Sequence, residues 1–111
     1  MAGESFDLDN DIAILSINSP KSSVGGPYCV VHKDTDERYA IVALDWDGVP
    51  SLGMRWFWGN GGNPFSSAHP TWLVVPSGLL NSILNGLPLD FTFRRNIDKF
   101  LGGELPGSDL R

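Results

Sequence analysis

The sequence predicts an α+β fold, with a single, mostly antiparallel, twisted sheet of four to five strands and two C-terminal helices packed on one face. Short runs of β-branched and aromatic residues alternate with turn-forming residues up to residue 75. Two stretches with apolar residues at helical spacing follow, over residues 77–87 and 90–101. The length of 111 residues fits one domain, 1–111. The segments that we expect to be loose are residues 1–5 and 104–111.

The central element is a predicted β-hairpin over residues 39–58, YAIVALDWDGVPSLGMRWFW. Gly48 and Pro50 lie between two runs of strand-forming residues, which is typical of a turn. Because side chains alternate along a strand, a loop with an odd number of residues places the large apolar side chains of both strands on one face. That face would hold Ala40, Val42, Leu44, Trp46, Leu52, Met54, Trp56 and Trp58. A slip of one residue would bring Asp45 into the core, so we expect the odd loop.

Further strands are expected on both sides of the hairpin, and the start of the chain is ambiguous. Residues 28–33 (YCVVHK) lie close enough to the hairpin for a three-strand antiparallel meander. Residues 71–75 (TWLVV) are short, apolar and β-branched, as in a buried strand. In residues 8–17, three isoleucines favour a strand, but the apolar spacing and the leading aspartates also fit a helix. We expect a strand there and keep the helix as the alternative.

The two predicted helices have recognisable ends. Ser77 can cap the start of the first helix, and Gly86 can end it. Asp90 or Thr92 can cap the second, because short polar side chains accept hydrogen bonds from the free N–H groups of a first turn. Both helices carry an apolar stripe, so we expect both to pack on the tryptophan face of the sheet.

Composition and charge limit the classes of partner. The net charge of −5, with eight Lys and Arg, argues against a nucleic-acid partner, which would need a basic surface. Cys29 is the single cysteine, so an internal disulfide is impossible and a reducing compartment fits. The first residues lack the pattern of a signal peptide, and no apolar run approaches the roughly 20 residues that span a bilayer. We therefore expect a cytoplasmic protein without a membrane or nucleic-acid partner.

A candidate ligand site lies at the loop over residues 59–70, GNGGNPFSSAHP. Loops of about a dozen residues are uncommon in small domains, and those that occur are often functional. Aromatic rings beside this loop could stack on a sugar, a base or a cation. The residues that we assign to this site are Trp58, Asn60, Asn63, His69 and Asp45.

No arrangement of side chains in the sequence predicts catalysis. Asp45 and Asp47 are paired carboxylates, but no further metal ligand lies near them in the sequence. Cys29 and His32 are three residues apart on one strand, so their side chains should point to opposite faces. The glycines of residues 59–62 are not followed by the lysine and helix of a phosphate-binding loop. We expect no catalytic residue, no metal site and no cofactor.

The hairpin face opposite the tryptophans carries both large apolar and charged residues. Since two helices cover only one face of a sheet well, we expect this second face to remain open. A contiguous apolar patch on a monomer usually marks an interaction site. The residues that we assign to an interface are Tyr39, Ile41, Phe57 and Arg55. They favour a homo-oligomer, most simply a dimer, or another protein partner.

Residues 53–76, GMRWFWGNGGNPFSSAHPTWLVVP, resemble small hypothetical proteins of the mobile-element or integron gene-cassette type. This resemblance implies no function, because no residue of that family has an assigned role. The residues themselves favour a small, non-enzymatic binding or interaction module. The alternatives are a small-ligand binder or small enzyme that uses the loop over residues 59–70, and an acidic, antitoxin-like inhibitor of a basic partner.

Overall fold

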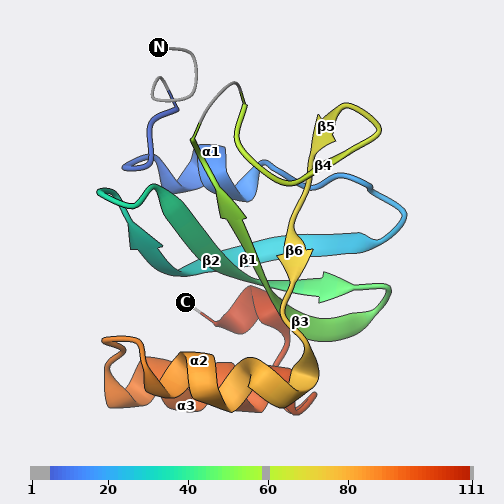
Figure 1. Ribbon diagram of the computed structural model, residues 1–111. Coiled ribbons are helices and arrows are strands. Elements are labelled where there is room, and N and C mark those ends of the chain that lie inside the picture. The colour runs from blue at the N-terminus through green and yellow to red at the C-terminus, as the bar shows by residue number, and fades with distance from the viewer. Residues whose placement is uncertain (1–5, 59–60, 111) are drawn as a thin grey trace.

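The computed structural model describes residues 6–58 and 61–110, and it confirms the α+β fold with an antiparallel sheet (Figure 1). The main sheet has four strands in the order β1-β2-β3-β6, and a second sheet has two. The strands are β1 (Val24–Asp34), β2 (Tyr39–Trp46), β3 (Val49–Trp56), β4 (Phe65–Ser66), β5 (His69–Pro70) and β6 (Leu73–Val74). The helices are α1 (Asp11–Leu15), α2 (Leu80–Asn85) and α3 (Phe91–Leu101), with 3₁₀ turns at Ser77–Leu79 and Gly107–Asp109.

The hairpin of β2 and β3 forms as expected, but its register is the one that we rejected. Trp46 pairs with Val49 across a two-residue turn, Asp47 and Gly48. Both turn residues have positive φ, 51° and 81°, which is the backbone of a type I′ turn. An Asp-Gly pair tolerates that conformation, and the turn therefore fixes the register. The prediction of an odd loop, with the three hairpin tryptophans on one face, is wrong.

Asp45 avoids the buried position that made this register look unfavourable. Its partner across the hairpin is Pro50, close to the end of both strands. There its carboxylate accepts a hydrogen bond of 2.5 Å from the hydroxyl group of Tyr28 on β1. The strand end leaves Asp45 partly exposed, so the cost of burying an unpaired charge does not arise.

Both faces of the sheet are covered. The helix face is the one that packs on α2 and α3, and its buried sheet residues, such as Ile41 and Leu52, contact Leu84, Phe93 and Ile97. The N-terminal face is the one that packs on the chain before β1, and its buried members are Leu8, Ile14, Ala40, Val42, Leu44, Phe57 and Trp72. Figure 1 shows α1 on one side of the sheet and α2 and α3 on the other. The expected open face therefore does not exist.

The segment that covers the N-terminal face contains a helix where we expected a strand. The side chain of Asn10 caps α1 by accepting a hydrogen bond of 3.1 Å from the Ala13 N–H. Ile14 is fully buried on the sheet, whereas Ile12 is 83% exposed. This one-sided burial is that of a surface helix. The strand prediction for residues 8–17 is wrong, and the helix alternative holds for residues 11–15.

The two ends of the chain differ in what can be described. Residues 104–110, which we expected to be loose, pack against β1: Leu110 is 2% exposed, and Gly107 lies against the ring of Tyr28. A β-carbon at Gly107 would lie 2.1 Å from that ring, so the approach requires glycine. The expected loose start, residues 1–5, and residue 111 lie outside the described residues.

Candidate functional site

The structure separates the residues that the sequence assigned to a ligand site. The indole N–H of Trp58 donates to the Glu37 carbonyl at 2.7 Å, and His69 is exposed in β5. Asp45 lies near the hairpin turn and binds Tyr28. Asn60 lies outside the described residues. Of the predicted set, Asn63 lines a hollow with the residues that now define the candidate site.

This site is a groove between β3, the loop after it and α2, which we call the Trp56 groove. It consists of two adjoining hollows with volumes of about 160 Å³ and about 310 Å³. Tyr39, Met54 and Trp56 line both hollows and so form their shared wall. The smaller hollow is completed by Arg55, Asn63, Pro64 and Leu73, and the larger one by Ile41, Ser82, Ile83, Gly86 and Leu87.

The hairpin register brings the shared wall together. Tyr39 pairs with Trp56, and Ile41 pairs with Met54, so all four side chains lie on the helix face. The rings of Tyr39 and Trp56 meet edge to face, with centroids 5.3 Å apart and an interplanar angle of 72°. The type I′ turn at Asp47 and Gly48 sets this register. It therefore also determines which side chains form the wall of the groove.

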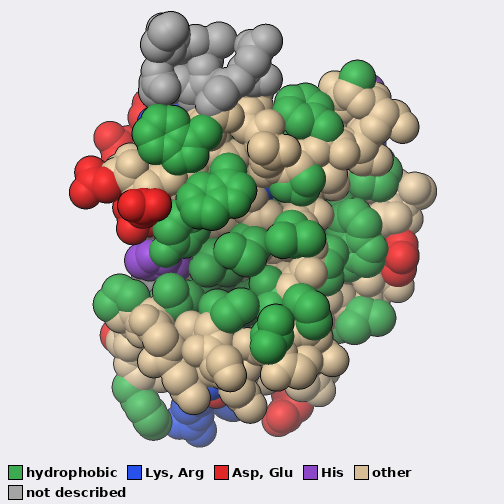
Figure 2. Space-filling model, in the orientation of Figure 1, with side chains coloured by type: hydrophobic (Ala, Val, Ile, Leu, Met, Phe, Trp, Pro, Cys, Tyr) green, Lys and Arg blue, Asp and Glu red, His purple; other side chains and the backbone are tan. Residues whose placement is uncertain are grey.

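The groove stays open because its covering elements are short. β6 pairs only with Gly53 and Met54, so the sheet edge beside Trp56 is left to Asn63. Trp56 is 43% exposed and Leu73 is 59% exposed. Figure 2 shows a continuous band of hydrophobic side chains on this side of the molecule, between the upper loops and α2. Such an apolar surface on a monomer usually marks a binding site.

Arg55 holds the loop wall of the groove in place. Its guanidinium group donates to three loop carbonyls, of Gly61 at 2.7 Å, Pro64 at 2.9 Å and Thr71 at 2.8 Å. It also lies 5.2 Å from the ring centroid of Phe57. The side chain is 2% exposed, and this burial lowers the pKa of Arg55 to about 10. The cation therefore organises the loop from inside the protein.

Glycine at position 62 allows the loop to come this close. A β-carbon there would lie 2.3 Å from the Trp56 carbonyl oxygen and 2.7 Å from Nη2 of Arg55. Its φ of +79° is also a conformation that other residues rarely adopt. Asn63 then pairs with Trp56 through two backbone hydrogen bonds, of 2.9 Å and 3.1 Å.

The residues that the sequence assigned to an exposed interface are mostly inside the protein. Ile41, Arg55 and Phe57 are 3%, 2% and 2% exposed. Phe57 directly follows β3 and lies on the N-terminal face, opposite to Trp56, where its ring packs on Phe6 with centroids 4.5 Å apart. Tyr39 is partly exposed, and it reaches the surface as a wall of the Trp56 groove.

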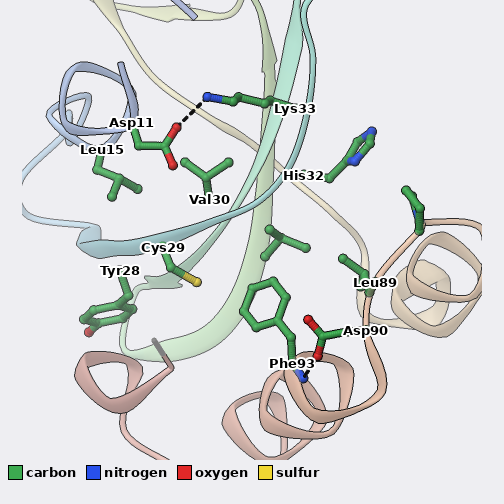
Figure 3. Close-up of a pocket in the computed structure, with 12 residues that line it drawn as sticks. Asp11, Leu15, Tyr28, Cys29, Val30, His32, Lys33, Leu89, Asp90 and Phe93 are labelled. Atoms are coloured by element: carbon green, nitrogen blue, oxygen red, sulfur yellow. Dashed lines mark hydrogen bonds and ion pairs between the residues drawn. The ribbon is translucent and has the colours of Figure 1, made fainter. Parts of the chain in front are cut away.

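A larger hollow, of about 440 Å³, lies along β1 between α1 and the start of α3 (Figure 3). A bulge between Val30 and His32 places His32 opposite Ile41, on the same face as Cys29, so the prediction of opposite faces is wrong. Figure 3 nevertheless shows the His32 ring pointing away from the Cys29 sulfur. Cys29 and His32 are therefore not arranged as a nucleophile and its general base.

The charged groups of this hollow already serve the fold. Lys33 forms an ion pair with Asp11 at 2.8 Å, and Asp90 caps α3 by accepting from the Phe93 N–H at 2.8 Å. In residues 6–58 and 61–110, no group of three or more His, Cys, Asp and Glu side chains is placed to hold a metal ion. The Trp56 groove differs because no helix or strand in the described part of the chain covers its apolar walls.

Comparison with known protein families, curated proteins and solved structures finds no match. The resemblance of residues 53–76 to gene-cassette proteins therefore stays a prediction. None of the helices that the structure describes has the length and apolar character needed to cross a membrane.

Sequence reasoning missed the groove because its wall comes from three distant segments: Tyr39 on β2, residues 54–56 on β3 and residues 82–87 at α2. The available signal was the Asp-Gly pair, which favours a two-residue hairpin turn. That turn pairs Tyr39 with Trp56 and so places both side chains on the same face of the sheet.

Proposed function

We propose that this protein is a non-enzymatic binding protein and that the Trp56 groove holds an aromatic or branched aliphatic group of a small molecule. The observation that supports this most directly is the half-exposed Trp56 in the wall shared by two apolar hollows. An apolar cavity of about 150 Å³ is large enough for a benzene ring. The smaller hollow has about this volume, 160 Å³, and the larger one gives room for the rest of the ligand.

The composition of the walls supports binding without catalysis. Small-molecule sites are mostly apolar, with a few polar groups that fix the orientation of the ligand. Here Asn63 and Ser82 supply such groups at the two ends of the groove. The single buried Cys29 is consistent with a reducing, cytoplasmic location, which we include in the proposal.

The test is a titration with benzyl alcohol, followed by two-dimensional ¹H–¹⁵N NMR. We expect the Trp56 indole signal to shift together with the amide signals of Met54 and Asn63. Trp56→Ala should weaken binding about tenfold or more, because an aromatic wall is lost. Trp58→Ala is the matched control, since Trp58 is similarly exposed, at 46%, but lines neither hollow. Shifts confined to the hollow along β1 would contradict the proposal.

A second candidate is a homodimer formed through the same surface. The exposure of Leu73, 59%, leaves more apolar area beside the groove than a small ligand would cover. In that case the partner of the groove is a second copy of the chain. Sedimentation equilibrium at micromolar concentrations should then show a dimer that Leu73→Glu dissociates. A monomer at all concentrations would exclude this candidate and leave ligand binding intact.

A further inference from the structure

The walls of the Trp56 groove offer no counter-charge to a ligand. Among the described residues that line its two hollows there is no Asp, Glu, Lys or His. Arg55 lines the smaller hollow, but it is 2% exposed and lies opposite Ala40 on the N-terminal face. Its guanidinium group donates to loop carbonyls there, so its charge is held on the other side of the sheet.

A ligand that fills such a groove must be neutral over the part that it buries. Removing a carboxylate or an ammonium group from water is costly, and buried charges in proteins are normally paired. Two other hollows differ, because Lys33 and Asp90 line the one along β1, and Asp45 and Glu104 line one beside the end of α3. The absence of accessible charge is therefore a property of the Trp56 groove and not of the whole surface.

The two hollows of the groove share a wall, so one molecule can occupy both. Tyr39, Met54 and Trp56 line each hollow, and a ring in either one therefore contacts this wall. The smaller hollow, of about 160 Å³, has the size of a cavity that holds a benzene ring. The larger one, of about 310 Å³, has room for a second ring and for the atoms that join the two.

The polar side chains of the groove suit a neutral substituent. Asn63 lines only the smaller hollow and Ser82 only the larger, and both residues are exposed. The backbone of Asn63 is engaged with Trp56 through two hydrogen bonds, so its side-chain amide is the group that can meet a ligand. An amide and a hydroxyl group both donate and accept hydrogen bonds without carrying charge, and such groups fix the orientation of a ligand in an apolar site.

We propose that the ligand of the Trp56 groove is a neutral molecule with two ring-sized apolar groups, one in each hollow, joined by a short linker. A carboxamide or hydroxyl substituent at one end meets Asn63 or Ser82. The linker is short because the hollows adjoin at a common wall. This inference rests on the proposed function, since it names the class of ligand for the same groove.

The experiment compares three compounds by isothermal titration calorimetry. Benzamide has one ring, 4-benzylbenzamide has two rings joined by one carbon, and 4-benzylbenzoate replaces the carboxamide of the second compound by a carboxylate. We expect 4-benzylbenzamide to bind about tenfold or more tightly than benzamide, since burying the second ring resembles burying a Phe side chain. We expect 4-benzylbenzoate to bind about tenfold or more weakly than 4-benzylbenzamide, because its charge meets no partner.

Two-dimensional ¹H–¹⁵N NMR then locates the two rings. Leu73 lines only the smaller hollow and Leu87 only the larger, so 4-benzylbenzamide should shift both amide signals with the same midpoint. Trp56→Ala should weaken its binding about tenfold or more, because both rings lose a common wall. Trp58→Ala is the matched control, since Trp58 lines neither hollow.

The outcomes separate this inference from the function that it rests on. Equal affinity for benzamide and 4-benzylbenzamide, with shifts in the groove for both, would overturn the two-ring ligand and leave the groove as a binding site. Binding of 4-benzylbenzoate as tight as that of 4-benzylbenzamide would overturn the neutral class. No binding of any of the three compounds at millimolar concentration would overturn the proposed function as well. These comparisons use the wild-type protein, so they hold even if Trp56→Ala does not fold.

Discussion

The two faces of the sheet each receive one tryptophan from the β3–β6 region, and the two indoles have opposite environments. Trp72, on the N-terminal face, is 3% exposed, and its indole N–H donates to the Ile17 carbonyl at 2.7 Å. Trp56, on the helix face, is 43% exposed and packs on Tyr39. The difference comes from the covering elements, since the segment with Ile17 passes over Trp72, whereas none of residues 6–58 and 61–110 covers Trp56 in this way. A large apolar side chain left uncovered beside a complete core indicates a surface used for binding.

The largest expected effect tests this difference directly. Trp72→Ala should lower the free energy of unfolding by about 3–5 kcal/mol, because it leaves a cavity and an unpaired Ile17 carbonyl. Trp56→Ala should cost only about 1 kcal/mol, since the side chain is half-exposed and stabilises few buried groups. Urea denaturation of both variants measures the two values. Equal losses would show that Trp56 is a structural residue and would remove the main support for the groove.

The next largest effect concerns the close contact between Gly53 and Trp72. Gly53 lies under its ring on the N-terminal face, and a β-carbon there would lie 2.8 Å from Leu44 Cδ2 and 3.0 Å from the Trp72 β-carbon. Gly53→Ala should therefore destabilise the protein by about 2 kcal/mol through overpacking. Gly78→Ala is the control, because a β-carbon there meets nothing within 4 Å. A neutral Gly53→Ala would mean that the N-terminal face is less tightly packed than the structure shows.

The parts of the fold that the sequence allowed us to predict depend on local chemistry. The cap of α3 by Asp90 could be predicted because helix capping depends on residues close together in the sequence. The burial of Trp72 could be predicted because the segment TWLVV is short and apolar. The hairpin register was predicted wrongly because we gave more weight to gathering apolar side chains on one face than to the turn sequence. Asp47-Gly48 prefers a two-residue turn, and this preference sets the register. The error then propagated, because it placed Tyr39 and Trp56 on different faces.

The cover of the N-terminal face and the role of Arg55 could not be read from the sequence. α1 is a five-residue helix, too short for a clear periodic signal, and it reaches the sheet only through long-range packing. A charged residue in a strand is normally exposed. Arg55 is buried because carbonyls 6 and 16 residues further along the chain, of Gly61 and Thr71, accept hydrogen bonds from its guanidinium group. The candidate site therefore depends on contacts that only the folded chain reveals.

Arg55 links the two faces, and its removal should affect the groove more than the core. The side chain lies opposite Ala40, on the N-terminal face, yet it fixes the loop that walls the groove on the helix face. We expect Arg55→Met to lower the free energy of unfolding by about 1–2 kcal/mol, because three hydrogen bonds are lost while a buried charge is removed. Amide hydrogen exchange should accelerate at Gly61 and Asn63 and stay unchanged in α3. The exposed Arg95 supplies the control, Arg95→Met.

The smallest effect concerns the hydrogen bond from the Tyr28 side chain on β1 to the Asp45 side chain near the end of β2, on the helix face. The hydrogen bond to Asp45 is the main cause that raises the pKa of Tyr28 to about 12, from 10.0. The folded state thus holds this proton more tightly, so the stability it contributes is complete below pH 10 and is lost as the pH rises towards 12. Tyr28 is partly exposed to solvent, so the contribution should be only about 1 kcal/mol. Tyr28→Phe should be less stable than the wild type by this amount at pH 8, and the gap should close by pH 12, as measured by urea denaturation. A gap independent of pH would place the effect of Tyr28 in its ring packing on Phe100 rather than in its bond to Asp45.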